Sequence, residues 1–189
     1  MSSGGFYRLL ADPAATSRWY LKSPLDPAGD EVDPRLFTRG TPVGSLPPLS
    51  LPLRRTGDEL DFNFCDFDMV VTPSAFNAEL ETLVGSVVQR IPVIVDGRSD
   101  WFEILNICEL VKCVDEARSV LTKWTAADGR PDKIGQYRMI VELKIDPAAA
   151  QDHQIFRIAD WPIALIVSEK VKSLLEVRKV SGLRFQRVD

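Results

Sequence analysis

The side chains that could carry out catalysis are few, and they are scattered along the chain. His153 is the only histidine, so a Ser–His–Asp or Cys–His nucleophile would have to use it. Carboxylates cluster within residues 58–61 and 66–68, where two could converge for general acid–base chemistry of the glycosidase type. Such pairs also arise on any solvated strand edge, because alternate residues share a face. We expect no catalytic residues, and a hydrolase that uses these carboxylates remains an alternative.

Glycines and cysteines give no signature of a bound ligand. Gly4, Gly5 and the glycines of residues 40–44 match neither a P-loop nor a dinucleotide fingerprint. The three cysteines are an odd number and lack the paired spacing of zinc ligands. We therefore expect free thiols in a reducing compartment, with no metal and no cofactor. These cysteines are Cys65, Cys108 and Cys113.

Composition fits one sizeable globular domain. The chain has 189 residues, 45% of them hydrophobic and 26% charged, with a formal net charge of −4. This acidic balance argues against a nucleic-acid partner. The N-terminal residues lack the pattern of a secretory signal, and the longest uncharged apolar run, residues 161–167, is too short to cross a bilayer. These features predict a cytoplasmic protein without a membrane or nucleic-acid partner.

The first sixty residues differ from the rest. Residues 26–52 hold six prolines with three glycines between them, which excludes a regular helix or a central strand. Residues 46–53 favour an ordered arm that is anchored by its leucines, although a ligand for a proline-reading module, and hence a scaffold protein, stays open. We predict an arm over residues 1–60, with a short strand at 18–22, packed on a main domain of residues 61–189.

Two segments repeat the order strand, helix cap, helix and glycine. In the first, Thr72 is expected to cap a helix with Pro73 at its first position, and Gly85 to end it. In the second, Ser168 is expected to cap a helix that precedes Gly182. The pattern predicts helices near residues 73–84 and 169–180.

Most of the remaining sequence predicts strands. Residues 87–95 are extended, with Pro92 favouring an edge or a bulge, and residues 101–107 and 154–158 follow the same pattern. Between residues 139 and 145, every odd-numbered residue is apolar, and two of the three even-numbered residues are charged. This alternation predicts a half-buried strand whose odd-numbered side chains face inward. The fold class predicted is α+β, a mainly antiparallel sheet with two principal helices and a proline-rich irregular N-terminal arm.

One turn has the composition of a protein-binding loop. Asp96 and Gly97 predict a tight exposed turn between strands, where recognition residues are readily placed. The surrounding segment, residues 69–116, has eight acids and three bases, which favours a basic partner. A solvated hairpin would have the same sequence. The residues expected to contact a partner are Asp96, Arg98, Asp100 and Trp101.

Residues 65–188 resemble immunity protein family 11 of bacterial polymorphic toxin systems. The order and spacing of short stretches carry the resemblance: VVTPSAFNAEL (70–80), IPVIV (91–95), WFEILNI (101–107), VDEARS (114–119), IFRI (155–158), IVSEKV (166–171) and GLRF (182–185). The resemblance implies a cytoplasmic, non-enzymatic protein that binds a cognate toxin. Occlusion of that toxin is our leading hypothesis, and the oligomeric state is left open.

Overall fold

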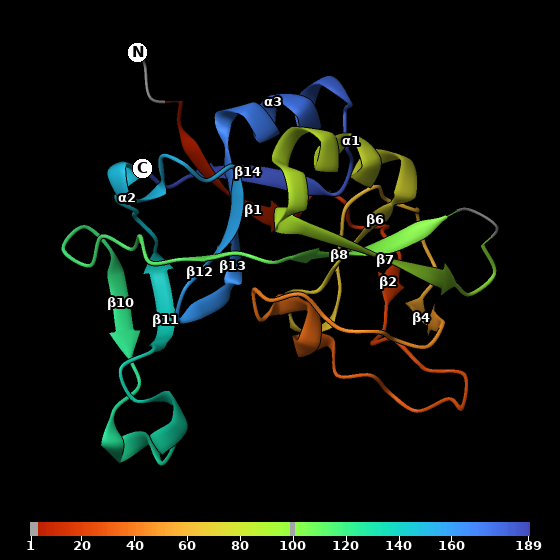
Figure 1. The fold of residues 1–189 in the computed structure, drawn as a ribbon, viewed down its shortest axis with the longest axis horizontal. Coiled ribbons are helices and arrows are strands. Elements are labelled where there is room, and N and C mark those ends of the chain that lie inside the picture. The colour runs from red at the N-terminus through yellow and green to blue at the C-terminus, as the bar shows by residue number, and fades with distance from the viewer. Residues whose placement is uncertain (1–3, 99–100) are drawn as a thin grey trace.

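The structure, a computed structural model, describes residues 4–98 and 101–189. Two five-stranded sheets form its framework, and the two longer helices lie next to each other on the same side of the molecule (Figure 1). Helix α1 (Ser74–Val84) packs on one sheet and α3 (Glu169–Val177) on the other. The arrangement confirms the α+β class.

The first sheet is antiparallel except at one edge, where β12 and β9 run parallel. Its strands in spatial order are β14 (Leu183–Arg187), β1 (Phe6–Ala11), β13 (Trp161–Ser168), β12 (Ile155–Ile158) and β9 (Leu110–Val111). The N-terminal strand thus lies between two C-terminal ones. Arg157 of this sheet is fully buried, and its Nη2 donates to the carbonyl of Asp68 at 2.9 Å, which ties the two halves of the molecule together.

The second sheet is antiparallel except between β3 and β7. Its strands in spatial order are β3 (Leu49–Leu51), β7 (Val88–Val95), β8 (Phe102–Ile107), β6 (Val70–Pro73) and β5 (Asn63–Phe64). Strand β3 pairs with β7 only over Val93–Val95, so β7 has an edge without a neighbouring strand before Val93. Pro92 lies on that stretch, as expected for a residue that lacks a backbone donor.

The proline-rich segment is ordered. Leu49 and Leu51 are buried, so its leucines anchor it as expected, and β2 (Tyr20–Leu21) lies in the predicted short strand and pairs with β4 (Leu53–Arg55). Residues 1–60 supply β1 to one sheet and β3 to the other. The division into an arm and a main domain at residue 60 stays a prediction.

Both helices lie where the sequence predicts them, but the first begins differently. Ser168 caps α3, since its hydroxyl accepts from the Val171 amide. Gly85, at φ 70°, ends α1. The predicted Thr72 cap is wrong: Pro73 occupies the N-cap position, while Thr72 lies in β6 and its hydroxyl donates to Asn77 at 2.5 Å.

Gly182 turns the chain from α3 into β14 at φ +93°. A Cβ at this position would lie 2.5 Å from the carbonyl oxygen of Phe62, so the close approach of two backbones requires glycine.

The strand at residues 137–142 has the opposite face inward from the one predicted. In β11 (Tyr137–Glu142), Ile140 is buried while Met139 and Val141 are exposed. Its pairing with β10 (Val120–Lys123) shifts register twice, and each bulge changes which side faces the core. After these shifts Leu143 and Ile145 are buried as expected.

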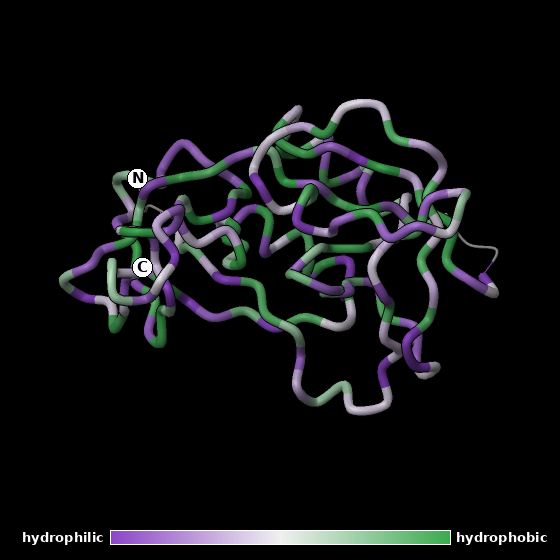
Figure 2. Tube along the Cα trace, turned by 90° about the horizontal axis from the view of Figure 1, so that it is seen from below, coloured by the Kyte–Doolittle hydropathy of each residue, from purple (hydrophilic) through white to green (hydrophobic). Residues whose placement is uncertain are grey.

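Strands β10 and β11 form a separate two-stranded sheet, here called the ribbon, which extends away from the rest of the molecule (Figure 1). Hydrophobic and hydrophilic segments alternate along the chain, and hydrophobic ones also occur at the end of the molecule where the two chain termini lie (Figure 2). The short helical elements of the chain are η1 (Pro34–Thr38), η2 (Asp66–Asp68), η3 (Gly85–Val87), η4 (Ala126–Asp128), η5 (Pro131–Lys133) and α2 (Pro147–Ala150).

Candidate functional site

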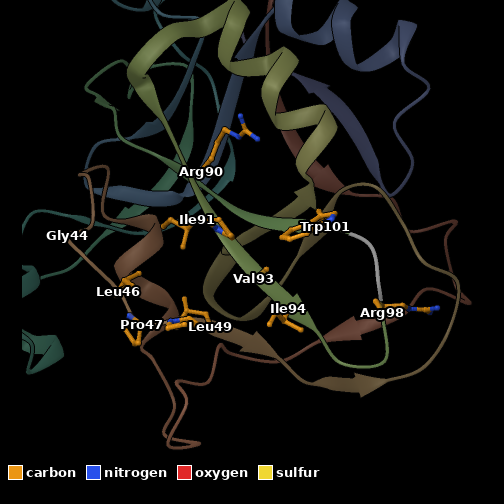
Figure 3. A pocket seen from close by; sticks show the side chains of 12 residues that line it. Gly44, Leu46, Pro47, Leu49, Arg90, Ile91, Val93, Ile94, Arg98 and Trp101 are labelled. Carbon is orange, nitrogen blue, oxygen red and sulfur yellow. The ribbon is translucent and has the colours of Figure 1, made fainter.

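An apolar groove of about 630 Å³ runs beside the free edge of β7. Residues 44–49 lie on one side of β7 and Trp101 on the other, with side chains of β7 between them (Figure 3). Ile94 is 65% exposed here and Trp101 is 79% exposed. The volume lies within the range of small-ligand and peptide-anchor sites.

The groove exists because the proline-rich segment is attached to β7 at two points and diverges from it between them. At one end, the Gln89 side chain accepts from the Val43 amide at 2.8 Å and donates to the Val43 carbonyl at 2.7 Å, as a neighbouring strand would. At the other end, Leu49 pairs with Val93. Pro47 and Pro48 lie between these points and have no N–H to donate, so no regular pairing with β7 can form there.

A second amide supports the first attachment. Asn106 is fully buried in β8, and its Nδ2 donates to the Thr41 carbonyl at 3.0 Å and to Gln89 Oε1 at 2.9 Å. The segment that leads into this side of the groove is therefore held at residues 41–43 by partly buried hydrogen bonds as well as by packing.

The described residues of the predicted binding loop lie near one end of this groove. The Asp96 amide donates to the Leu51 carbonyl at 3.1 Å, and Arg98 Nε lies 3.1 Å from Glu59 Oε2, with its guanidinium 5.3 Å from the Trp19 ring centre. Arg98 and Trp101 both line the groove. The predicted contact residue Asp100 lies outside the described residues.

The backbone of Trp101 is hydrogen-bonded to the start of α1. Its carbonyl accepts from the amide of Ser74 at 2.9 Å, which joins the end of the loop to the first residue of α1. The ring itself is mostly in solvent. An aromatic ring that is exposed on a rigid backbone is favourable for binding because it loses little conformational entropy when covered.

Most acidic side chains of residues 69–116 lie beside basic side chains, many of them from outside this segment. Counting acids and bases within the segment does not show these pairs. Six of the eight acids lie within ion-pair distance of a basic side chain, although the pair of Glu109 with His153 counts only when the histidine is protonated. These acids are Glu79, Glu81, Glu103, Glu109, Asp115 and Glu116. Long-range attraction of a basic partner therefore depends on the whole face rather than on this segment alone.

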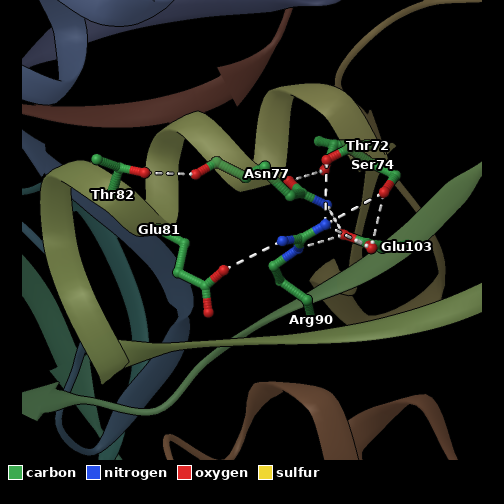
Figure 4. A network of polar contacts seen from close by, with 8 residues as sticks. Thr72, Ser74, Asn77, Glu81, Thr82, Arg90 and Glu103 are labelled. Carbon is green, nitrogen blue, oxygen red and sulfur yellow. Dashed lines mark hydrogen bonds and ion pairs between the residues drawn. The ribbon is translucent and has the colours of Figure 1, made fainter.

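A network of polar contacts connects α1 to β7 and β8 behind the groove (Figure 4). Arg90 binds Glu103 through Nε at 2.8 Å and Nη2 at 2.9 Å, and Glu81 through Nη1 at 3.1 Å. Burial alone would raise the pKa of Glu103, but hydrogen bonds from Arg90, Asn77 and Ser74 outweigh it and hold the pKa below its usual value. The network fixes the strand that forms one side of the groove.

The carboxylates considered for catalysis have separate structural partners. Asp58 accepts a hydrogen bond from Ser17, Asp61 accepts from the Ser181 amide at 2.8 Å, and Asp66 binds Arg54 at 2.8 Å. Burial raises the pKa of Asp68, although Arg157 and Arg8 lie near it. These contacts do not describe a pair of carboxylates that face one substrate.

The part of the chain at residues 4–98 and 101–189 holds no group of three or more His, Cys, Asp or Glu side chains suited to a metal ion. Burial raises the pKa of the Cys113 thiol to about 12, and Cys65, Cys108 and Cys113 are all free. Within the same ranges no helix has the length and apolarity needed to cross a bilayer.

The sequence singled out Arg98 and Trp101 but did not predict the groove that they line. The groove forms between residues about 45 positions apart, and the amide of Gln89 that connects them has no local signal in the sequence. The one available hint was Pro92, which marked an interrupted strand edge.

The model of the Immunity protein family (Imm11) matches residues 97–189, just under half of the chain. This match confirms the family resemblance. It includes Arg98 and Trp101, whereas Asp96 and the similar stretches at 70–80 and 91–95 precede it. No curated protein matches the sequence.

Proposed function

We propose, from the match of residues 97–189 to an immunity protein family, that this protein binds a cognate bacterial toxin in the cytoplasm and neutralises it by occlusion. Occlusion needs a complementary surface of roughly 800 Å² on each partner and no catalytic residue. A protein with this function protects the cell only as long as the complex persists, so slow dissociation is the property that matters.

The exposure of Trp101 beside the groove is the observation that carries the proposal for the binding face. The ring is 79% exposed in a chain whose Trp19 and Trp161 are buried. Tryptophan is enriched among the residues that dominate binding energy in protein interfaces. Such residues lie in well-packed pockets and tend to contact the dominant residues of the partner. We assign the contacts to Asp96, Arg98, Asp100 and Trp101, together with the groove.

The rigidity of the face supports the same assignment. Gln89 and Asn106 hold the segment at residues 41–43, Arg90 and Glu103 hold β7 against α1, and the Trp101 carbonyl is bonded to Ser74. A surface that is already ordered loses less entropy on binding, which favours tight complexes.

Co-expression with the product of a neighbouring toxin gene tests this function. The full chain is expected to restore growth of cells that make the toxin and to co-purify with it at a fixed ratio. The test variant is Trp101→Ala, and its matched control is Trp124→Ala, because Trp124 belongs to the ribbon end of the molecule and is partly buried. Protection that is lost with Trp101→Ala and kept with Trp124→Ala supports the face. A full chain that neither protects nor binds excludes the function.

A further inference from the structure

The groove is one of three hollows that follow each other across the molecule. A second hollow shares Trp101 with the groove and is lined also by Glu59 and Ser74. A third shares Pro73 and Ala75 with the second and continues to Glu79 on α1. Trp101 therefore stands between an apolar groove on one side and a more acidic hollow on the other.

The charges along these hollows are unequal. The second and third hollows are lined by three carboxylates and one guanidinium group, a net charge of −2, whereas the groove is lined by two guanidinium groups. The carboxylates belong to Glu59, Asp61 and Glu79, and the guanidinium groups to Arg178 in the third hollow and to Arg90 and Arg98 in the groove. The groove and the two hollows beyond Trp101 therefore differ in the sign of their charge.

Two of these acids remain open to a partner. The side chain of Glu59 is 32% exposed although Arg98 contacts it, and that of Glu79 is 39% exposed although Arg178 contacts it. Exposed pairs of this kind contribute little to stability, so a cation from a partner can share or replace the arginine at small cost. The exposed ring of Trp101 offers the same cation a second favourable contact through its face.

We infer that the toxin segment recognised here is basic and apolar: an apolar side chain enters the groove, and a lysine or arginine next to it lies over Trp101 and against Glu59. This inference rests on the proposed function and specifies the chemistry of the partner. The groove supplies the apolar half of the recognition, and the unequal charge of the second and third hollows supplies the other half.

The test compares two double variants of the full chain in binding to the purified toxin. Glu59→Gln with Glu79→Gln removes two charges from the hollows, and Glu116→Gln with Asp132→Asn removes two charges from exposed ion pairs at the ribbon. At about 50 mM salt the first variant is expected to associate roughly tenfold more slowly than the parent, because charge on the face steers encounter. The ribbon variant is expected to behave as the parent does.

The salt dependence of binding distinguishes an effect of the lost surface charge from an effect of an altered fold. At about 300 mM salt the difference between the first variant and the parent is expected to shrink, because surface charges are screened over a few ångströms. Ile94→Asp, in the groove, is expected to weaken binding by more than tenfold at both salt concentrations. Circular dichroism of each variant checks that the fold is kept.

The outcomes of the inference and of the proposed function are distinct. If the toxin does not bind the parent chain, the proposed function is wrong. If the toxin binds the parent and the Glu59 and Glu79 double variant with the same rate at both salt concentrations, the function stands and the basic partner is excluded. If Ile94→Asp binds as the parent does, the groove is not where the apolar side chain lies.

Discussion

The groove and the ribbon both expose apolar side chains, but they differ in shape and in support. In the groove, Ile94 and Trp101 lie beside a concave surface whose far side is held by the buried amide of Asn106 and the half-buried amide of Gln89. On the ribbon, Val120, Met139 and Val141 lie on a two-stranded sheet whose only sheet neighbours are each other. Exposed apolar area alone therefore does not identify a binding site; the rigid concave surroundings distinguish the groove.

The polar contacts of the two regions differ in the same way. Behind the groove, Arg90 is 26% exposed and its partner Glu103 only 8%. On the ribbon, Lys123 and Glu116 form a comparable pair with 38% and 48% of their side chains exposed. Burial makes the first pair costly to break, while solvent makes the second nearly dispensable.

The largest expected difference between the regions is in stability. Glu103→Gln removes a carboxylate that binds Arg90, Asn77 and Ser74, and it leaves the arginine without its main partner. We expect a loss of about 3 kcal/mol in the free energy of unfolding, the lower end of the range for a broken buried pair. Urea denaturation followed by circular dichroism measures it.

Glu116→Gln is the matched change beside the ribbon. It removes contacts with Lys123 and Tyr137, both at the surface, and we expect less than about 0.5 kcal/mol. Equal losses for the two variants would contradict the contrast between the regions.

The next effect concerns binding. Trp101→Ala is expected to weaken toxin affinity by about 30-fold, since a central exposed tryptophan commonly contributes about 2 kcal/mol. Met139→Ala, which removes a comparable exposed side chain from the ribbon, is expected to change affinity by less than about twofold. Isothermal titration calorimetry distinguishes the two, and a larger effect at Met139 would move the binding face to the ribbon.

A smaller effect is expected from the attachment of the proline-rich segment. Gln89→Ala removes both hydrogen bonds to Val43 and one from Asn106, which should cost about 1–2 kcal/mol locally. We expect faster amide hydrogen exchange over residues 41–48, with unchanged exchange in the ribbon, and roughly fivefold weaker toxin binding. Unchanged exchange over residues 41–48 would show that packing alone holds this side of the groove.

The smallest expected effect is on how the free energy of unfolding depends on pH in the acid range. The pKa of Glu103 is lower in the folded protein than in the unfolded chain, where it is about 4.3. Its stabilising contribution is therefore complete above that value and is lost as the pH falls through the folded-state pKa. The unfolding free energy of Glu103→Gln should fall less steeply than that of the parent below about pH 4.5. Parallel pH profiles of the two proteins would contradict this assignment.

Local signals in the sequence predicted two helix ends correctly, although Pro73 rather than the expected Thr72 occupies the N-cap position of α1. Ser168 and Gly85 mark helix ends because capping and left-handed backbone depend on one residue and its neighbours. The inward face of β11 was predicted wrongly because the two bulges come from pairing with β10, which an alternation pattern cannot reveal.

The candidate site shows the same limit. Trp101 and Arg98 were identified from the composition of one turn, and the structure brings both to the groove. The far side of that groove depends on Gln89 contacting Val43 and Asn106 contacting Thr41, pairs separated by 46 and 65 positions. Contacts over such distances have no periodicity, so nothing in a single sequence predicts them.

Pro92 has a consequence beyond the shape of the groove. An uncovered strand edge is a template on which other chains can assemble through backbone pairing. On β7 that edge is limited to the residues before Val93, and Pro92 removes a donor within it, while residues 44–48 pass alongside. The apolar side chains beside this edge can therefore be contacted by another molecule, while few free backbone groups are left for another strand to pair with, which disfavours assembly through this edge.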